Sequence, residues 1–391
     1  MDTATRRLLK IGVLAGSFLV AACQTAKLTD LKPGERPNIQ STEAGLWLQA
    51  DRMEQRVQRQ GNLIRDPELH RYLHGIICRL SAEHCPQIRV YIVERAGFNA
   101  SMTPNGMMIV QSGLMLRTQN EAQLAYVLGH EMAHYIRRHT LQRWQTVKES
   151  AGFMMIVGLA LGASGFGSAS PVVNAAVVGG IFANNRENER EADRLGLEML
   201  AKAGYAPDQA SKVWSNLIAE KDAMAENDSG RSFFATHPDE GERKEKLTQL
   251  AAALPPAKSK PTVNKKPFIK AIDRHKSRWL EKELRLGKFD RTTVLLDLLK
   301  KESGANGSLH YFQGELFRKR NDEGDVENAI KAYKLALTFD DAPAKTHRAL
   351  GLIYRAQGNK PDAKSALADY LRLRPQAEDK AMIRHYLETM K

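Results

Sequence analysis

The run His130-Glu131-Met132-Ala133-His134 is the segment of this chain whose residue types and spacing most clearly indicate chemistry. On a helix, residues four apart lie about one turn apart on one face, so both imidazoles can reach one metal ion at about 2.0–2.1 Å. Glu131 is rotated by about 100° from His130, which lets it contact a metal-bound water without binding the metal. We therefore expect His130 and His134 to bind one Zn²⁺ and Glu131 to act as the catalytic base. A helix with exposed histidines is the alternative.

Further ligands must come from outside this run, because a catalytic zinc site of this class uses three protein ligands and leaves one position to water. A later acidic helix start offers Glu187, Glu189 and Glu191, and the residues alone do not separate these three. His139 lies about 140° around an ideal helix from His134. We therefore expect His139 to point away from the metal and not to bind it.

A small sheet is expected to precede and position the helix that carries the motif. Residues 87–94 alternate and are rich in β-branched side chains, and residues 107–111 form a second strand after the turn signal at 104–106. Residues 98–100 are expected only to turn the chain. The capping-box sequence at 118–121 should then begin the helix.

The rest of the chain is expected to be mostly helical, which makes the fold mainly α with a small β-sheet. Helices are expected at 47–59, from 66 onward, and at 186–205, 207–220 and 238–254. The composition predicts a first domain at 46–254, a linker rich in proline and lysine at 255–272, and a second, all-α domain at 273–391.

Residues 150–185 contain no charged side chain and form two apolar blocks, 151–163 and 171–183. Each block is too short to cross a hydrocarbon core of about 30 Å comfortably. We expect a buried helical hairpin, and a hairpin that dips into a membrane is the alternative.

The first 23 residues are expected to be an export signal and not part of the fold. Basic residues precede a short apolar stretch at 11–22, and small residues then lead to Cys23. This end resembles the bacterial lipobox, in which the cysteine is acylated and becomes the mature N-terminus. We therefore expect a lipid on Cys23 and a polar tether at 24–45, while an ordinary signal peptide with an incidental cysteine is the alternative.

Export also bears on Cys78 and Cys85, the two remaining cysteines. In an oxidising compartment they are expected to pair and close a short loop, because unpaired thiols are uncommon in secreted chains. Two free thiols are the alternative, since the sequence does not show whether the two side chains meet.

The chain is basic, with a formal net charge of +13. Such a balance suits nucleic acid, an anionic membrane or an acidic partner. The sequence contains no zinc finger, no aromatic RNA-binding motif and no recognition-helix pattern. We therefore expect no nucleic-acid partner, and a membrane-facing surface fits the N-terminus better.

The C-terminal part shows an internal repeat. Three positions recur at an offset of 34 residues: Ala329, Tyr333 and Ala336 against Ala363, Leu367 and Tyr370. Gly314 and Gly351 mark tight helix packing in each unit. The pattern resembles the tetratricopeptide repeat, whose period is about 34, and a degenerate unit is expected around 279–301. An ordinary helical bundle is the alternative.

Three separate runs together resemble one zincin metallopeptidase family: LGHEMAHYIRRHT, RENEREADRLG and the Thr-His-Pro at 236–238. This family includes HtpX, the CAAX prenyl proteases and BepA, and the appended repeats give a layout similar to that of its BepA-like periplasmic members. The resemblance covers roughly residues 45–250 and implies an α+β zincin-like peptidase domain followed by tetratricopeptide-like repeats.

The resemblance also implies roles for particular residues. It makes Glu189 the third metal ligand and Asp193, one turn on, the residue that orients a ligating histidine. His237 would bind the metal in the resting enzyme, or else serve in packing. Arg243 would structure the loop that carries His237.

The expected activity is zinc-dependent cleavage of unfolded or extended polypeptides in the periplasm, with the chain lipid-anchored at the outer membrane. Strand 107–111 would bind the substrate as an edge strand. The repeats would hold a partner protein, and the resemblance suggests outer-membrane protein quality control with the barrel-assembly machinery as partner. The alternative is a periplasmic chaperone or adaptor that acts through its repeats, with a latent metal site.

Overall fold

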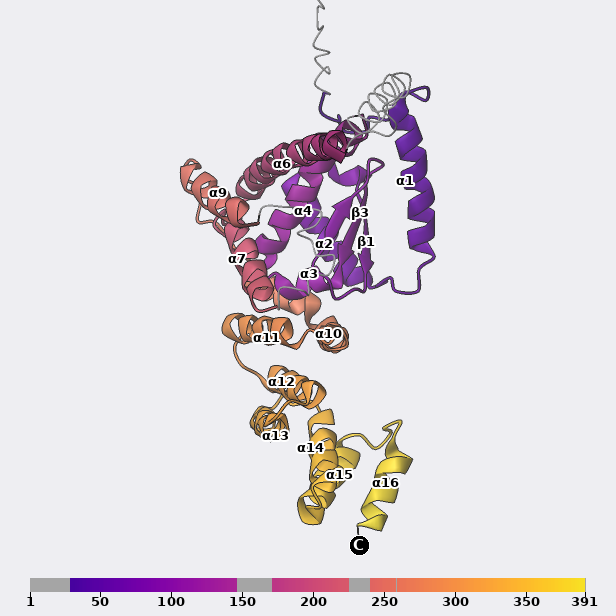
Figure 1. The fold of residues 1–391 in the computed structure, drawn as a ribbon, viewed down its shortest axis with the longest axis vertical. Coiled ribbons are helices and arrows are strands. Elements are labelled where there is room, and N and C mark those ends of the chain that lie inside the picture. Colours follow the sequence, from indigo (N-terminus) through magenta and orange to yellow (C-terminus); the bar gives the residue numbers. More distant parts are fainter. Residues whose placement is uncertain (1–28, 146–170, 225–239, 258, 391) are drawn as a thin grey trace, which may run out of the picture.

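The computed structural model describes residues 29–145, 171–224, 240–257 and 259–390. Cys23, His237 and the first apolar block, 151–163, lie outside the described residues. The described helices and strands form an upper body around a small sheet and a column of helices that leads down to the C-terminus (Figure 1).

The sheet has three strands, β1 (Arg89–Val93), β2 (Ala100–Met102) and β3 (Met107–Gln111). They lie in the order β1-β3-β2, with β1 parallel and β2 antiparallel to β3. Two expectations were wrong. Residues 98–100 lead into strand β2, which is too short to show alternation, and β3 lies at the centre of the sheet, not at its edge.

Helices α1 (Thr42–Gln58), α2 (Pro67–Leu80), α3 (Ser112–Arg117) and α4 (Glu121–Ile136) surround this sheet, with the 3₁₀ turn η1 (Cys85–Gln87) before β1. The expected capping box at the start of α4 is wrong. Asn120 is the N-cap, since its side chain accepts a hydrogen bond from the Gln123 backbone N–H at 3.0 Å. The Glu121 carboxylate instead accepts hydrogen bonds from Tyr72 and Tyr205 at 2.7 Å each.

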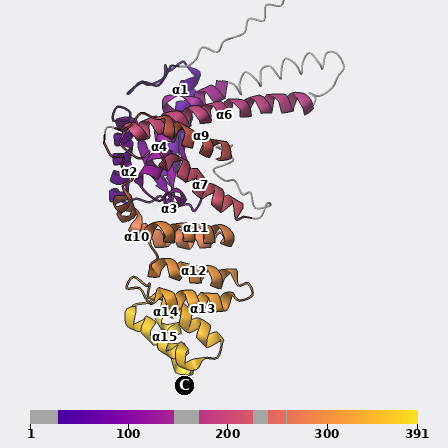
Figure 2. The same ribbon diagram turned by 90° about the vertical axis from the view of Figure 1, so that its left-hand side faces the viewer.

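The first arm of the expected hairpin lies outside the described residues, and only the second apolar block, 171–183, is described. This block belongs to α6 (Pro171–Lys202), one continuous helix that also contains the acidic run, and Figure 2 shows this helix reaching out past the body. No proline follows Pro171 before the end of α6, so the backbone hydrogen bonds of the helix can continue through Gly179 and Gly180 into the acidic run. Helices α7 (Gln209–Asp222) and α9 (Glu240–Ala253) follow. Within the described residues, no helix combines the length and the apolarity that crossing a membrane requires.

The expected linker at 255–272 is partly structured. Its backbone pairs with the first domain, with a hydrogen bond of 2.9 Å from the Ala206 N–H to the Thr262 carbonyl. Helix α10 (Lys265–Leu284) begins inside it and buries Phe268 and Ile272. The buried side chains are apolar residues that stand between the lysines. The proline and lysine content alone therefore did not predict this packing.

The remaining helices are α11 (Phe289–Ser303), α12 (Gly307–Arg320), α13 (Asp325–Ala336), α14 (Lys345–Ala356), α15 (Lys360–Leu373) and α16 (Lys380–Thr389). They stack layer on layer below the sheet domain (Figures 1 and 2). Gly314 of α12 lies against the Tyr333 ring of α13, and Gly351 of α14 lies against Leu367 of α15 in the same way. The two helical hairpins therefore repeat one packing contact, while their assignment to the tetratricopeptide family stays a prediction.

Candidate metal centre

The donor atoms of three side chains converge between α4 and α6. His130 Nε2 lies 3.1 Å from His134 Nε2 and 3.3 Å from Glu189 Oε2, and His134 Nε2 lies 3.3 Å from Glu189 Oε1. Ligands held at 2.0–2.1 Å from a tetrahedral zinc ion stand about 3.3 Å from one another. Each Glu189 oxygen thus lies at about this distance from one of the two histidines. The three side chains therefore form a donor triangle of about the size of one face of a zinc tetrahedron and can hold a metal ion.

A close helix contact brings these donors together. Gly129 on α4 meets Gly196 on α6, and a Cβ added to Gly196 would stand 2.9 Å from the His130 backbone nitrogen. Only glycine allows such an approach without moving a backbone. The contact lies beside His130 and within two helical turns of Glu189, so it sets the spacing between the histidine helix and the carboxylate helix.

The second ring nitrogen of His130 is also held. His130 Nδ1 lies 3.0 Å from Asp193 Oδ1, and Asp193 accepts hydrogen bonds from Tyr126 Oη at 2.6 Å and from Arg243 Nε at 2.7 Å. An Nδ1–H that donates to Asp193 leaves the Nε2 lone pair of His130 facing the other donors. Carboxylates commonly orient metal-binding histidines in this way.

Buried charge favours a cation at this point. Glu189, Asp193 and Arg243 are each 3% exposed, and Arg243 Nη1 lies 2.9 Å from Glu189 Oε2. Burial and Arg243 oppose a charged His130 ring, yet Asp193 and Glu189 outweigh them and raise the pKa of His130 to about 9. The carboxylates therefore create a negative potential at the ring, and this potential would stabilise a bound metal ion.

The second ring nitrogen of His134 contacts His139, and here the expectation that His139 points away is wrong. Its Nδ1 lies 2.9 Å from His134 Nδ1, while its Nε2 lies 3.0 Å from Glu191 Oε2. Helix α4 ends at Ile136, and Arg138 adopts a left-handed conformation with φ of 57°, so the ideal helix angle no longer applies. His139 is therefore a neighbour of a candidate ligand but not one of the three donors.

The hydrogen bonds that link His134, His139 and Glu191 determine which ring nitrogen of each histidine carries the proton. Glu191 is an acceptor, so His139 Nε2 carries the proton and His139 Nδ1 accepts. His134 Nδ1 then donates to it, which leaves the lone pair of His134 Nε2 toward His130 and Glu189. Arg137 holds the far end, since its Nη2 lies 2.5 Å from Glu191 Oε1.

The N-terminal segment docks beside this chain of groups. Asp30 pairs with Arg137, and the Leu31 N–H donates to the Ile136 carbonyl at 2.8 Å. Leu31 is 3% exposed. Asp30 and Leu31 of the expected tether are therefore packed against the end of the histidine helix, close to the partners of His134.

Glu131 is buried at 3% exposure. Burial raises the pKa of its carboxyl to about 7, although His130 and Arg243 act in the opposite direction. A carboxyl group with a pKa near neutrality can exchange a proton in both directions, as a general base requires.

The three carboxylates that the residues alone left open occupy different places. Glu187 points to solvent, with a side chain 76% exposed, and Glu191 contacts His139 and Arg137. Glu189 alone of the three lies in the donor group. Tyr126 was missed, although its place four residues before His130 puts it on the same helix face.

Cys78 and Cys85 are joined by a disulfide that links α2 to η1. The bond lies apart from the donor triangle in sequence and closes a short loop before β1. It is not part of the donor group of His130, His134 and Glu189.

Comparison with known proteins adds independent information. Residues 63–251 match the model for Peptidase family M48. The chain is 28% identical over 188 residues to the beta-barrel assembly-enhancing protease of Escherichia coli K12 and 30% identical over 188 residues to that of Yersinia pestis. Each match covers 45% of this chain and 37% of the relative.

A second group of relatives comes from mitochondria. The chain is 28% identical over 162 residues to the mitochondrial metalloendopeptidase OMA1 of Schizosaccharomyces pombe, which covers 41% of this chain and 45% of the relative. The chain thus spans less than half the length of these relatives. The matched residues contain the donor triangle and its partners, and this chain therefore carries a domain of peptidase family M48.

Proposed function

We propose that this protein is a zinc-dependent endopeptidase of the bacterial cell envelope that cleaves unfolded or misassembled proteins. The single observation that carries the proposal is the donor triangle of His130, His134 and Glu189. The two histidine nitrogens lie 3.1 Å apart and each lies 3.3 Å from one Glu189 oxygen, which is close to the ligand spacing around tetrahedral zinc. The family match supports the peptidase part of this proposal.

The chemistry is hydrolysis of a peptide bond. A bound zinc ion would polarise the scissile carbonyl and lower the pKa of a water molecule. Glu131 would take the proton from that water and pass it to the leaving amine. Asp193 and His139 would keep the Nε2 atoms of His130 and His134 unprotonated, and the buried surroundings would exclude bulk water from Glu131.

An extended substrate is favoured by the corrected sheet order. Because β3 is central, β2 is the strand that can accept a further strand on the side nearer the site. Met102 of β2 and His134 line the same small cavity. A polypeptide that adds to β2 would therefore run past the donor triangle, which suits unfolded segments or loops.

The proposed location follows from the N-terminal sequence. A lipid on Cys23 would hold the domain at the outer membrane through residues 24–45. The names of the bacterial relatives refer to β-barrel assembly. By analogy, we propose quality control of outer-membrane proteins, with the assembly machinery or its clients as partners of the C-terminal helices.

A chaperone or adaptor with a latent metal site is the second candidate, because the C-terminal helices form a large surface of their own. Hydrolysis of unfolded casein by the wild type and by Glu131→Gln separates the two. A peptidase loses cleavage in the variant and keeps its metal. If neither protein cuts and both protect a client equally, the adaptor function is correct.

Metal content tests the site directly. Purification without chelator, followed by elemental analysis, is expected to give about one zinc ion per chain, as for other sites with three protein ligands. Anomalous scattering from crystals would then place the ion between His130, His134 and Glu189, and would show whether His237 also reaches it. Protein without stoichiometric metal would contradict the proposal.

A further inference from the structure

A groove crosses the C-terminal helices far from the metal centre along the column. It encloses about 770 Å³ and is lined by α10 and α12 on one side and by α14, α15 and the segment before α16 on the other. Its floor includes a strip of apolar residues along α14: Ala349, Leu352, Ile353 and Ala356. A groove of this size can hold several side chains of a bound polypeptide.

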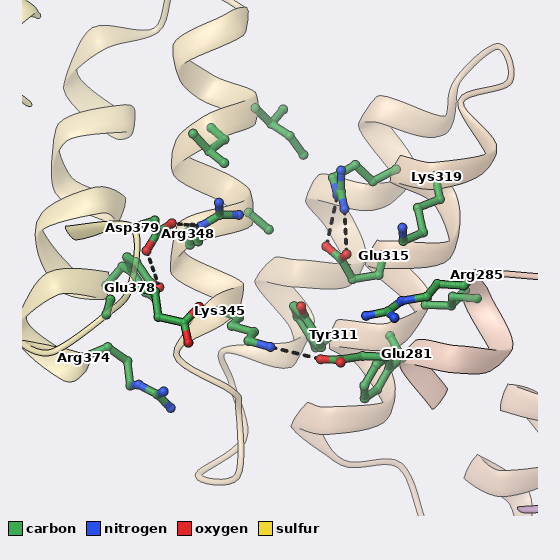
Figure 3. A pocket seen from close by; sticks show the side chains of 18 of the residues that line it. Glu281, Arg285, Tyr311, Glu315, Lys319, Lys345, Arg348, Arg374, Glu378 and Asp379 are labelled. Carbon is green, nitrogen blue, oxygen red and sulfur yellow. Dashed lines mark hydrogen bonds and ion pairs between the residues drawn. The ribbon is translucent and has the colours of Figure 1, made fainter. Parts of the chain in front are cut away.

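Some of the charges in this groove cancel one another. Three ion pairs join basic and acidic residues of the lining: Lys345 with Glu281 at 3.0 Å, Arg318 with Glu315 at 2.7 Å, and Arg348 with Asp379. Figure 3 shows the Lys345–Glu281 pair spanning the two walls. The first and third pairs join different elements of the lining, the second lies within α12, and all three leave little net charge of their own.

Three further basic residues of the lining are exposed, namely Arg285, Lys319 and Arg374. Within the described part of the chain, no carboxylate lies at ion-pair distance from any of them. Arg285 and Lys319 stand on one wall and Arg374 on the other (Figure 3). Glu378 is the one acidic lining residue that is likewise unpaired among the described residues, so the groove keeps an excess of positive charge.

We propose that this groove binds an extended acidic segment of a partner polypeptide. Its carboxylates would pair with Arg285, Lys319 and Arg374, and its apolar side chains would lie on the α14 strip. The pattern of a central apolar strip with charges on both walls suits a chain that alternates the two kinds of residue. The inference gives the chemistry of the partner in the proposed function, but it does not depend on peptidase activity.

Two other occupants fit less well. Single-stranded nucleic acid binds by stacking its bases on exposed rings, whereas the aromatic residues of the lining are buried: Tyr311 and Tyr370 are each 7% exposed and Phe312 is 2% exposed. A second copy of this chain would bring its own net charge of +13 toward a basic groove.

Fluorescence anisotropy with a labelled peptide of alternating Glu and Leu tests the proposal. The full chain carries Glu131→Gln, so that cleavage cannot remove the probe. The triple variant Arg285→Ala, Lys319→Ala and Arg374→Ala is expected to bind about tenfold more weakly, since each exposed ion pair contributes a factor of about two to three to the affinity. Higher salt should weaken binding to the parent chain and affect the triple variant less.

The matched control removes three exposed lysines outside the groove, by Lys246→Ala, Lys331→Ala and Lys360→Ala. It makes the same change in net charge and is expected to bind the peptide as tightly as the parent chain. Equal weakening in both triple variants would show attraction to overall charge and overturn the proposal.

Two probes complete the test. A peptide with Gln in place of Glu should bind weakly. Equal binding would show that only the apolar floor binds the peptide and would overturn the proposed role of the basic residues. A thymidine oligonucleotide of equal charge should also bind weakly. If it bound as tightly and lost affinity in the groove variant, the groove would be a nucleic-acid site. Casein hydrolysis by the chain with intact Glu131 is measured separately, so loss of peptide binding and loss of peptidase activity are distinguishable.

Discussion

The Nδ1 atoms of His134 and His139 lie 2.9 Å apart, and the far nitrogen of His139 lies 3.0 Å from Glu191. His139 thus stands between a carboxylate and a candidate metal ligand. Because Glu191 accepts a hydrogen bond from His139 Nε2, His139 Nδ1 is left to accept one from His134 Nδ1. The Nε2 lone pair of His134 then faces the donor triangle. Asp193 orients His130 in the same way, by direct contact with its Nδ1 at 3.0 Å.

Replacing His139 should therefore weaken metal binding without removing a ligand. His139→Ala takes away the acceptor for His134 Nδ1, and partners of this kind typically contribute 10–100-fold to metal affinity or activity, so we expect a loss of about that size. Competition with a chromophoric chelator measures the affinity. His139→Gln, whose amide oxygen can still accept the hydrogen bond, should restore part of it. Equal affinity in the wild type and His139→Ala would show that the contact does not orient His134.

The carboxylate that binds the metal can be identified by paired variants. Glu189→Gln removes a donor atom from the triangle and should lower zinc affinity by more than about 100-fold, beyond the loss expected for an orienting residue. Glu187→Gln, two residues earlier and exposed to solvent, makes the same chemical change and should leave zinc content and casein hydrolysis unchanged. Zinc retained at full occupancy by Glu189→Gln would mean that the third ligand is another residue.

The sequence predicted that the two histidines share one helix face, because spacing on one helix is a local property. His130 and His134 lie on α4, and their common face follows from helix geometry alone. Glu189 was different. Three carboxylates lie within five residues, and only the packing of α4 on α6 decides which of them faces the histidines. That packing depends on Gly129 and Gly196, which no periodic pattern singles out.

Features that depend on tertiary context were the ones predicted wrongly. Strand β2 has three residues and gains its order by pairing with β3. Sheet order itself is not local, so β3 could not be recognised as the central strand. His139 was misplaced because the chain leaves helical geometry at Arg138, whose positive φ is uncommon for a residue other than glycine.

Both the stability of the fold and its affinity for zinc should depend on the Gly129–Gly196 contact. Gly196→Ala places a Cβ about 2.9 Å from the His130 backbone nitrogen, so α4 and α6 must separate. Overpacking of this kind costs about 1–3 kcal/mol in the free energy of unfolding, and the wider triangle should bind zinc more weakly. Urea unfolding and chelator competition measure the two effects.

Gly75→Ala is the matched control, because a Cβ at Gly75 on α2 meets nothing within 4 Å. Alanine is the better helix former by up to about 1 kcal/mol, so this variant should be as stable as the wild type or slightly more so. A Gly196→Ala protein that behaves like Gly75→Ala would show that the two helices are not held at the distance described.

The docking of α1 on the sheet should depend on pH through Glu54. Its carboxylate accepts hydrogen bonds from Arg89 Nε at 2.6 Å, Tyr91 Oη at 2.8 Å and Asn105 Nδ2 at 2.9 Å. Burial alone would raise the pKa of Glu54, but Arg89 and Tyr91 outweigh it and hold the pKa below its ordinary value of 4.5. The native state therefore favours the ionised form, and its contribution is fully present above about pH 4.5.

Glu54→Gln should lower the free energy of unfolding at pH 7 by about 1–2 kcal/mol, because it removes the charge that these donors share. The difference from the wild type should shrink as pH falls below 4.5, because the Glu54 carboxyl then binds a proton in the unfolded wild type and, at lower pH, also in the native wild type. Urea titrations between pH 3 and pH 7 measure this convergence. Glu245→Gln, at an exposed position on α9, should show little difference at any pH. A Glu54→Gln deficit that stayed constant down to pH 3 would mean that packing, and not the charge of Glu54, holds α1 on the sheet.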